Sequence, residues 1–408
     1  MKKFTTYLTE QKNTHMEHLE DSVLNFGVRG AREAINFIQS LRDMLSGNAS
    51  RPVDATVKWD GAPAIFAGID PRDSQFFVAK KGIFNKEPKI YKRESEIDAD
   101  LSGDLADKFK LALKHLPKLG ITGVVQGDFL YSSDTLNTDT IDGEKVVTFH
   151  PNTIVYAVPS DSDLGRTIRS SSIGIVWHTT YSGDSFESMK ASFGKDISSK
   201  LKNTKEVWHT DATYRDVSGK ATMTQKETEA VTSILSQAGK TFNKVNAKVL
   251  NTIAENEEIK TRIKTHFNTK VRAGQKIANP TAHVRDLVSY VIQYYDKQIE
   301  SKKTDKGKTP WIEKKKEMMR FFGGSNMNDL IQIFTLMNLI IQAKEMIIKK
   351  MDQASSIGTF LKTASGYKVT SPEGYVAISS SGSAVKLVNR LEFSKANFSD
   401  EVIKGWQK

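Results

Sequence analysis

The spacing of apolar residues divides the 408-residue chain into helical and strand-like segments. Residues 14–46 and 222–356 carry apolar residues every three or four positions, which predicts amphipathic helices with one buried face. The expected buried faces consist of Ala34, Phe37, Ile38, Leu41 and Leu45 in the first segment, and of Val284, Leu287, Val288, Val291, Tyr295, Ile299, Leu330, Phe334, Met337 and Ile341 in the second.

Between these segments, from 53 to about 181, the pattern changes to short runs rich in Val, Ile, Phe and Tyr. Such runs, bounded by turn residues, predict β-strands, and a helix is expected among them at roughly 100–116. The runs are ATVKWD, PAIFAGI, QFFVAKKG, GVVQGDFLY, KVVTFH, NTIVYAV and IGIVWHTTY. Strand character returns after residue 357 in GYKVT, GYVAISS and SAVKLV. The lysine-rich segment 300–316, with its glycine and proline, is expected to be a loop between helices.

This order predicts an α+β protein whose β-rich core is interrupted by a helical module. The core would comprise 51–221 and 357–408, and the helical insertion 222–356. Residues 1–50 would form an N-terminal helical segment that packs on the core. A chain of this length exceeds the usual size of one hydrophobic core, so more than one unit is expected.

Composition and charge narrow the class of protein. The chain contains no cysteine, which excludes disulfides and thiolate zinc sites and is typical of a cytoplasmic protein. The most apolar stretch, 330–348, contains glutamine, asparagine and lysine and predicts a buried helix, so no membrane span is expected. The net charge is +11, and residues 222–356 hold 23 Lys/Arg against 14 Asp/Glu, a net of +9. A basic module of this kind indicates either a phosphate-bearing partner or a solvated helical surface.

One short stretch carries candidate chemistry. Lys58-Trp59-Asp60-Gly61 matches KxDG, and four further elements follow it in order. VAKKG contains Lys80 and Lys81, VVQGDFLY contains Asp128, PEGYVAI contains Glu373, and SAVKLVNR contains Lys386. This series resembles the motifs of the covalent nucleotidyltransferases, which include DNA ligases, RNA ligases and capping enzymes. The resemblance covers roughly 53–181 and 366–392.

The resemblance implies a fold, a reaction and roles for individual residues. The fold would be an antiparallel-sheet nucleotidyltransferase core, ATP-grasp-like as in ligases, with the helical module inserted. Lys58 would be the nucleophile that forms a covalent bond to AMP, and Asp60 would orient it. Other roles would be cofactor binding by Lys80, Lys81, Asp128, Glu373 and Lys386, stacking of the base on Tyr156 or Trp177, and binding of Mg²⁺ by Asp128 and Glu373. The sequence does not separate Tyr156 from Trp177. ATP as the nucleotide rests on the family resemblance alone.

The residue types suit this chemistry independently of the resemblance. A lysine attacks a phosphate only as the free amine, and an unperturbed lysine has a pKa of about 10.4. Neighbouring cations lower such a pKa and also neutralise the charge that develops on the phosphate. Carboxylates are ligands that suit Mg²⁺.

The chain departs from the ligase pattern at two positions. Pro63 stands where many DNA ligases have an arginine, and Val388 where the final motif has a second lysine; Arg390 is a possible substitute. His15 and His18 form a weaker candidate metal pair on a helix. Trp311, Phe321 and Phe322, beside lysines, could stack on unpaired bases or simply pack. Neither a Rossmann nor a P-loop glycine motif is present.

We therefore expect an ATP-dependent polynucleotide ligase that acts on nucleic acid, with RNA favoured over DNA. Only 22 residues follow Lys386, fewer than the C-terminal OB domain of DNA ligases needs, and this favours an RNA-ligase-like enzyme. One alternative is a ligase fold that binds nucleic acid or assembles with little catalysis. Another is a nucleotidyltransferase with a protein or small-molecule acceptor.

Overall fold

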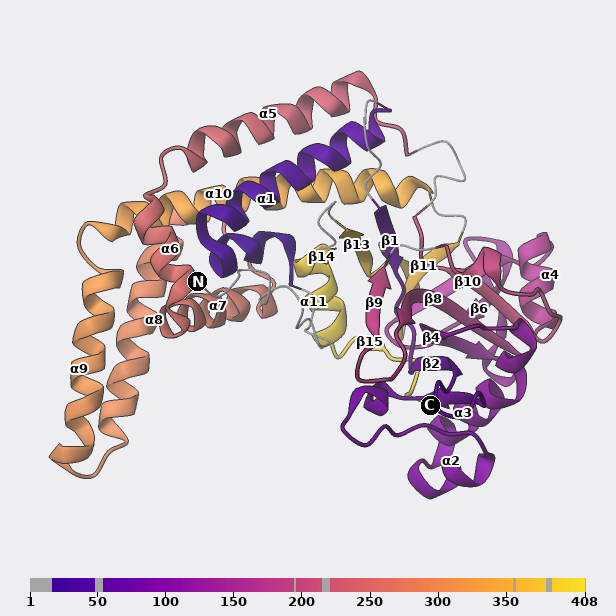
Figure 1. Cartoon of the computed structure of the whole chain (residues 1–408). Helices are drawn as coiled ribbons and strands as arrows, with labels where there is room; N and C mark the ends of the chain where they lie inside the picture. Colours follow the sequence, from indigo (N-terminus) through magenta and orange to yellow (C-terminus); the bar gives the residue numbers. More distant parts are fainter. Residues whose placement is uncertain are drawn as a thin grey trace.

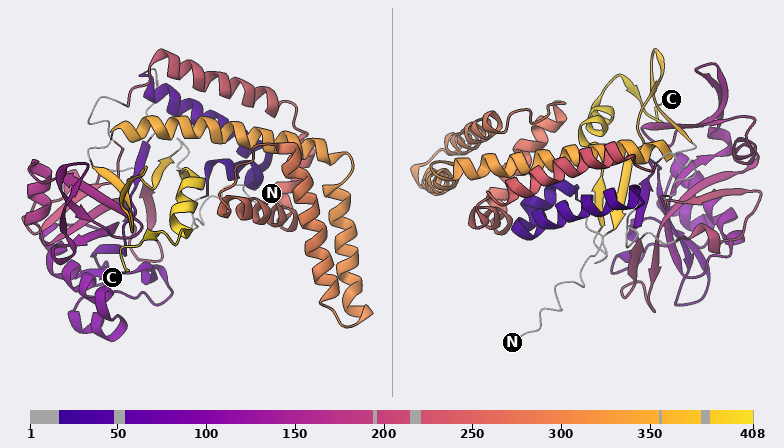
Figure 2. Two further views of the ribbon diagram at one scale, coloured as in Figure 1. Left: turned by 180° about the vertical axis from the view of Figure 1, so that it is seen from behind. Right: turned by 90° about the horizontal axis from the view of Figure 1, so that it is seen from above.

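The chain folds into a helical half and a β-rich half that lie side by side (Figures 1 and 2). This structure is a computed structural model, and it describes residues 17–47, 54–193, 196–214, 221–354, 357–378 and 384–407. Helices and three predominantly antiparallel sheets make up these residues, which confirms the α+β class predicted from the sequence.

Two six-stranded sheets build the β-rich half. Sheet II has the order β10 (Val207–Asp211), β8 (Ile173–Ser182), β4 (Val124–Ser132), β2 (Ala64–Ile69) and β3 (Phe76–Ala79), with β9 (Lys190–Phe193) beside β8. Sheet III has the order β12 (Gly366–Val369), β11 (Gly358–Thr363), β7 (Ile154–Pro159), β6 (Glu144–Phe149) and β5 (Asn137–Ile141), with β15 (Val402–Ile403) beside β11. Strand pairing is antiparallel throughout, except between β8 and β10.

The two sheets form two layers, and helices form a third. One face of sheet II packs on α2 (Glu94–Asp100) and α3 (Gly103–His115), where Phe109 and Trp177 are fully buried. The other face packs on sheet III through a second apolar cluster that includes Val176 and Phe149. A shorter helix, α4 (Asp163–Ser170), contacts β6 and β7. Buried residues run almost continuously along β7 and the first half of β8, as expected for strands covered on both faces.

The remaining strands form sheet I, which joins the two halves. It consists of β1 (Asp54–Lys58), β13 (Gly374–Ile378) and β14 (Ala384–Leu387), brought together from opposite ends of the sequence. One face carries Ala55, Tyr375, Ala377 and Leu387, which belong to the core of the helical half. Because side chains alternate along a strand, Lys58 and Lys386 point from the opposite face.

Within the described residues, seven helices form most of the helical half. They are α1 (Ser22–Leu45), α5 (Gln225–Phe242), α6 (Ala247–Glu255), α7 (Glu257–Arg272), α8 (Pro280–Glu300), α9 (Asp305–Phe322) and α10 (Asn326–Met351). Their shared core contains most of the apolar stripes expected from the sequence. The small helix α11 (Arg390–Phe398) packs on α7.

The N-terminal helix differs from our expectation. It was expected to pack on the β-rich core, but α1 packs on α5, α6 and α10 and so belongs to the helical half. The physical reason is that α1 and α10 are both long amphipathic helices, and each buries an apolar face on the other. The helical half is therefore assembled from two separate parts of the sequence.

The segment expected to be a lysine-rich loop is largely helical, so that prediction is wrong. Residues from Asp305 onward form α9, and the Thr304 side chain caps its start by accepting a hydrogen bond from the Gly307 amide at 3.2 Å. Pro310 lies within the first two turns, where it removes one backbone hydrogen bond. Packing of α9 along α8 offsets this loss, and the two helices project from the body as a hairpin (Figure 1).

The most apolar helix is a core helix. Within the described residues, 326–354 is the one helical segment long and apolar enough to cross a membrane by length and composition, and 50% of its most apolar window is buried inside the protein. It packs on α1, α5 and α8. Such burial is typical of the core helix of a soluble protein, as the sequence pattern predicted.

A cluster of buried charges holds the halves together beside sheet I. We call Glu20, Asp21, Lys344 and Arg390 the junction cluster. The Lys344 ammonium lies 2.7 Å from Glu20, and both side chains are 1% exposed. Arg390 lies 3.0 Å from Asp21. Two carboxylates and two cations thus balance one another, which is the arrangement that makes buried charge tolerable.

Candidate functional site

Lys58 ends β1 and forms an ion pair with Glu373, the residue before β13. The register of sheet I sets this contact, because Lys58 lies opposite Gly374. Only 7% of the Glu373 side chain is exposed, against 26% for Lys58. The lysine therefore has access to solvent, while its partner is enclosed. Two residues more than 300 positions apart in sequence meet here.

The Glu373 carboxyl titrates in an unusual range. Burial, together with the nearby carboxylates of Asp60 and Asp128, raises its pKa from 4.5 to about 7, although the Lys58 ammonium opposes the rise. A carboxyl group with this pKa can accept or release a proton near neutral pH. Glu373 is thus suited to exchange a proton with the lysine that it contacts.

Lys386 brings a second amine to the same face of sheet I. On the sheet it lies across from Val376, which in turn lies across from Thr56, two residues before Lys58. Burial lowers the pKa of Lys386, and the Lys58 ammonium lowers it further. The Lys386 amide also donates a hydrogen bond to the Glu17 carbonyl at 3.0 Å, so the start of the described chain runs beside β14.

Asp60 anchors the turn that follows Lys58. Its carboxylate accepts hydrogen bonds from the Asn152 side chain at 2.6 Å and from the amides of Thr153 and Ile154 at 2.6 and 2.8 Å. The Asp60 amide donates to the Tyr156 hydroxyl at 2.7 Å. These bonds join the end of β1 to the start of β7 in sheet III. Asp60 therefore positions the turn that follows Lys58.

Gly61 allows this turn to lie against β4. A Cβ atom on Gly61 would lie 2.5 Å from the Cβ of Asp128, closer than real side chains approach. The Ala62 amide also donates to the Phe129 carbonyl at 2.9 Å. Asp128 thereby lies next to the KxDG turn, with its side chain 21% exposed and the His178 Nε2 atom 3.8 Å away.

The two candidates for base stacking are both enclosed. Trp177 is 0% exposed and packs on the α3 side of sheet II, whereas Asp128 and its partner Val176 lie on the other face. Tyr156 is 3% exposed, and its ring packs on Phe149 and Trp59 at centroid distances of 5.2 and 4.9 Å. Neither ring has a face left for a nucleobase, so the stacking role predicted for them is wrong. Tyr156 instead supports the Asp60 turn.

Lys80 and Lys81 are directed elsewhere. The Lys80 ammonium lies 3.2 Å from Asp100 of α2. Lys81 is exposed at the start of the 3-10 helix Lys81–Phe84 that follows β3. In the part of the chain that the structure describes, we find neither among the groups around Lys58. The VAKKG element begins at the end of β3, an edge strand of sheet II, and so lies outside sheet I. The order of the motifs in the sequence does not show this.

The departures from the ligase pattern also have structural consequences. Val388 is 2% exposed, so the position of the missing second lysine is buried in apolar surroundings. Arg390 does not take over its place, because its guanidinium is engaged by Asp21 and Asn268 and lies over the Phe267 ring. Pro63 follows a cis peptide bond within the turn after Gly61.

The candidate histidine pair has no support. His15 lies outside the described residues. His18 is enclosed beside Lys386, and burial lowers its pKa to about 3. It lies among the charges of the junction cluster, where it fills space next to β14.

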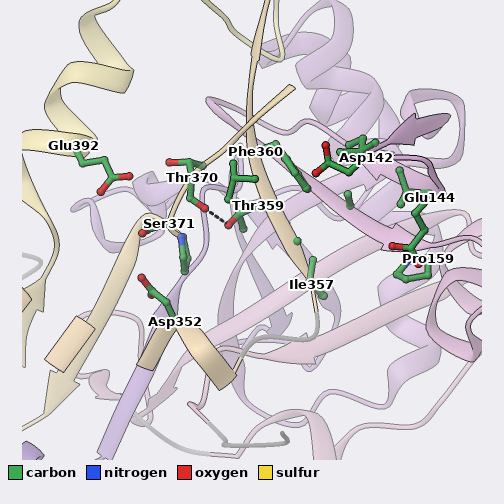
Figure 3. Close-up of a pocket in the computed structure, with 16 residues that line it drawn as sticks. Asp142, Glu144, Pro159, Asp352, Ile357, Thr359, Phe360, Thr370, Ser371 and Glu392 are labelled. Atoms are coloured by element: carbon green, nitrogen blue, oxygen red, sulfur yellow. Dashed lines mark hydrogen bonds between the residues drawn. The ribbon is translucent and has the colours of Figure 1, made fainter. Parts of the chain in front are cut away.

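A cavity of about 710 Å³ adjoins the site between sheet III and α11 (Figure 3). Its wall includes Thr370, Ser371 and Pro372, the three residues that precede Glu373. Four carboxylates line it, and its described lining includes neither lysine nor arginine; the four are Asp142, Glu144, Asp352 and Glu392. Such a wall repels phosphate. Lys58, Asp128 and His178 reach solvent outside this lining, beside the KxDG turn.

The space beside Asp128 and the KxDG turn fits a divalent cation only in part. Within the described residues, no three His, Asp or Glu side chains are grouped to hold a metal. Asp128 is half-buried beside the KxDG turn, and its negative charge contributes to the raised pKa of Glu373. A cation at Asp128 would relieve this crowding of carboxylates. Magnesium sites of this kind take one or two protein carboxylates and complete their shell with water and phosphate oxygens.

Sequence reasoning missed three residues near the site. Asn152 clamps Asp60, His178 approaches Asp128, and the Phe393 ring lies 6.0 Å from the Lys58 ammonium. Asn152 follows a proline in the turn before β7, and His178 lies directly after the predicted Trp177. None of the three residues belongs to a recognisable motif. They are identified only because the fold places them beside Asp60, Asp128 and Lys58.

Comparison with known proteins identifies the family and goes no further. The chain belongs to a family of unknown function (DUF6267), which it matches over residues 13–402. No curated protein matches the chain, and no solved structure does. The function must therefore be inferred from the site itself.

Proposed function

We propose that this protein is an ATP-dependent nucleotidyltransferase of the RNA-ligase type, in which Lys58 becomes covalently linked to AMP. One observation carries the proposal: Lys58 contacts Glu373 and shares one face of sheet I with Lys386. The three residues belong to three motifs spread over more than 300 positions, and they converge in the order that a KxDG enzyme needs.

The reaction would proceed by in-line displacement. The Lys58 Nζ atom attacks the α-phosphorus of ATP, the bond to the bridging oxygen breaks, and pyrophosphate leaves with that electron pair. Glu373 accepts a proton from the lysine amine, since its pKa of about 7 suits this exchange. Lys386 places a positive charge where negative charge develops on the phosphate. Bound Mg²⁺ would supply further neutralisation of the phosphates.

The remaining steps follow from this covalent intermediate. AMP moves from Lys58 to the 5′-phosphate of a polynucleotide, and the adjoining 3′-hydroxyl then displaces AMP to form a phosphodiester bond. The Asp60 clamp and the Tyr156 hydroxyl bond hold the turn after Lys58 through each transfer. Positioning of this kind contributes much of the rate of phosphoryl transfer.

The α8–α9 hairpin suits the nucleic-acid partner. Residues 301–322 contain 8 Lys/Arg and 3 Asp/Glu, a net of +5, and the hairpin projects from the body (Figure 1). Trp311 is half-buried, with the amines of Lys302 and Lys314 each 5.5 Å from its ring. Lysines on a projecting element can reach phosphates with little steric hindrance. Phe322, by contrast, is fully buried and serves packing.

Labelling with ATP tests the covalent intermediate. The full chain is incubated with [α-³²P]ATP and Mg²⁺, denatured and resolved on a gel. We expect a labelled band in the wild type and none in Lys58→Ala. Lys81→Ala is the matched control, because this exposed lysine belongs to the motif series but lies at the start of the 3-10 helix Lys81–Phe84, outside sheet I. Absence of label in the folded wild type would contradict the proposal.

The acceptor is tested by a chase. Labelled enzyme is mixed with 5′-phosphorylated RNA, with nicked DNA duplex, or with neither. Transfer of label to RNA, followed by release of AMP and a longer product, supports RNA ligation. Label that remains on the protein with every nucleic acid would favour a protein or small-molecule acceptor. Binding of RNA without label would favour a catalytically weak, nucleic-acid-binding ligase fold.

A further inference from the structure

His178 occupies an irregular point of sheet II next to the proposed active site. Across β4 and β8, Gln126 pairs with Thr179 and Gly127 pairs with Trp177, so His178 is an extra residue in the ladder. A β-bulge of this kind redirects a side chain, and bulges are frequent beside active sites. Here the imidazole is directed toward Asp128 on the neighbouring strand.

The contacts of the imidazole leave one nitrogen facing the carboxylate. Nδ1 lies 2.7 Å from the Thr179 hydroxyl oxygen, which engages that nitrogen in a hydrogen bond. Nε2 lies 3.8 Å from the Asp128 Oδ2 atom. This distance is too long for a hydrogen bond. Two bonds of about 2.1 Å to one octahedral cation place neighbouring donor atoms about 3 Å apart, so Nε2 and Oδ2 lie within about 1 Å of the separation at which both could bind one cation.

The surroundings leave room for further ligands. His178 and Asp128 are 27% and 21% exposed at their side chains, so solvent reaches the space beside both. In the described part of the chain, no third His, Asp or Glu completes a metal-binding group. The other coordination positions are therefore available to water and to phosphate oxygens.

We propose that Asp128 and His178 together bind a divalent cation whose shell is completed by water and nucleotide phosphate, and that this site prefers Mn²⁺ to Mg²⁺. The phosphate part rests on the proposed function; the two protein ligands do not. Mg²⁺ favours an all-oxygen shell, whereas an imidazole nitrogen suits transition-metal ions. Mn²⁺ shares the octahedral, oxygen-rich coordination of Mg²⁺ but, as a transition-metal ion, accepts an imidazole nitrogen more readily than Mg²⁺ does.

Electron paramagnetic resonance of free Mn²⁺ tests the site directly, without catalytic turnover. The full chain is titrated with MnCl₂, with and without a non-hydrolysable ATP analogue. We expect one bound ion, tighter binding when the analogue is present, and at least tenfold weaker binding in His178→Gln. Mg²⁺ should displace Mn²⁺ only at tenfold or greater excess.

A matched variant and a folding check keep the test specific. His209→Gln lies on the neighbouring strand β10, where the imidazole meets the Lys202 carbonyl, and it should bind Mn²⁺ like the wild type. Circular dichroism confirms that each variant is folded. Equal Mn²⁺ affinity in wild type and His178→Gln, or displacement by Mg²⁺ at equal concentration, would overturn the proposal.

The outcomes also separate this inference from the proposed function. If ATP labels Lys58 but His178 has no role in Mn²⁺ binding, the proposed function is supported and the metal site is contradicted. If Mn²⁺ binding depends on His178 but ATP does not label Lys58, the metal site is supported and the proposed function is contradicted. Neither result depends on the other.

Discussion

Two clusters of enclosed charge lie on either side of β14, and they differ in what surrounds them. In the junction cluster, Glu20 and Lys344 are each 1% exposed and bonded to each other. Around Lys58, the ammonium is 26% exposed, and three carboxylates share the space: Asp60, Asp128 and Glu373. The first cluster is closed and balanced, whereas the second is open and crowded with negative charge.

The pKa values of the two carboxyl groups paired with lysine, Glu20 and Glu373, express the same difference. Although burial opposes ionisation, the Lys344 ammonium holds the pKa of Glu20 below its usual range. At Glu373 burial prevails over the Lys58 ammonium, and the pKa rises to about 7. A purely structural ion pair has no need of an incompletely neutralised carboxyl beside a solvent-accessible lysine. The contrast therefore supports a chemical role for the Lys58 cluster and a structural role for the junction cluster.

The largest effect should come from breaking the closed cluster. Lys344→Met leaves the Glu20 carboxylate buried without its partner, which typically costs about 3–5 kcal/mol. We expect a loss of this size in the free energy of unfolding, measured by urea denaturation. Lys58→Met is the matched change in the open cluster, and it should lose less than half as much, because Glu373 can take up a proton and lose its charge.

A double variant checks the cause. Glu20→Leu combined with Lys344→Met removes both charges and should recover most of the stability lost in Lys344→Met. If Lys344→Met and Lys58→Met are equally destabilised, or if the double variant recovers nothing, the distinction between a closed and an open cluster fails.

A smaller loss is expected from the Asp60 clamp, the one well-satisfied part of the open cluster. Asn152→Ala removes the 2.6 Å hydrogen bond to the Asp60 carboxylate. Hydrogen bonds to charged groups contribute about 1.5–3 kcal/mol. We expect a destabilisation in this range together with slower labelling of Lys58. Asn137→Ala, whose exposed amide reaches only a backbone carbonyl at 3.3 Å, is the control and should change neither quantity.

The pH dependence of stability should separate the open cluster from solvent-exposed carboxylates. Burial raises the pKa of Glu373 from 4.5 to about 7, so the folded state retains a proton that the unfolded state has lost. The stability that this group contributes is fully present below pH 4.5 and is lost as the pH rises through about 7. Glu373→Gln should therefore gain in stability relative to the wild type over this range. Unfolding curves of the wild type and Glu373→Gln between pH 4 and 8 measure the difference.

The smallest effect is expected from Asp21, and it tests whether the closed cluster is fully balanced. Burial raises the pKa of Asp21 from 3.8 to about 6, although Arg390 opposes the rise. Its contribution to stability is present below pH 3.8 and is lost as the pH rises through about 6. Asp21→Asn should flatten this part of the pH profile, at lower pH than Glu373→Gln. If stability depends on pH in the same way in the two variants, the proposed difference between the clusters is contradicted.

Much of the fold could be predicted because it depends on local patterns. The seven strands between 53 and 181 were predicted from short runs rich in Val, Ile, Phe and Tyr, and the helices from apolar residues at every third or fourth position. The structure contains both sets of elements. The hairpin helix α9 was mistaken for a loop, since glycine, proline and lysines weaken the helical signal. Packing on α8 decides its structure, and no short segment of sequence contains that information.

The sequence by itself determined which residue types are available: an isolated KxDG lysine, an EGYVA glutamate and a distal lysine, in a fixed order. Tertiary structure decided which of them meet. Sheet I brings Lys58, Glu373 and Lys386 together because β1, β13 and β14 pair in one register, while Lys80 and Lys81 follow β3 of sheet II and Trp177 is buried in the core between sheet II and α3. The reason is physical: a motif fixes chemistry and spacing along the chain, but strand pairing and burial fix distance and charge environment, and these depend on residues hundreds of positions away.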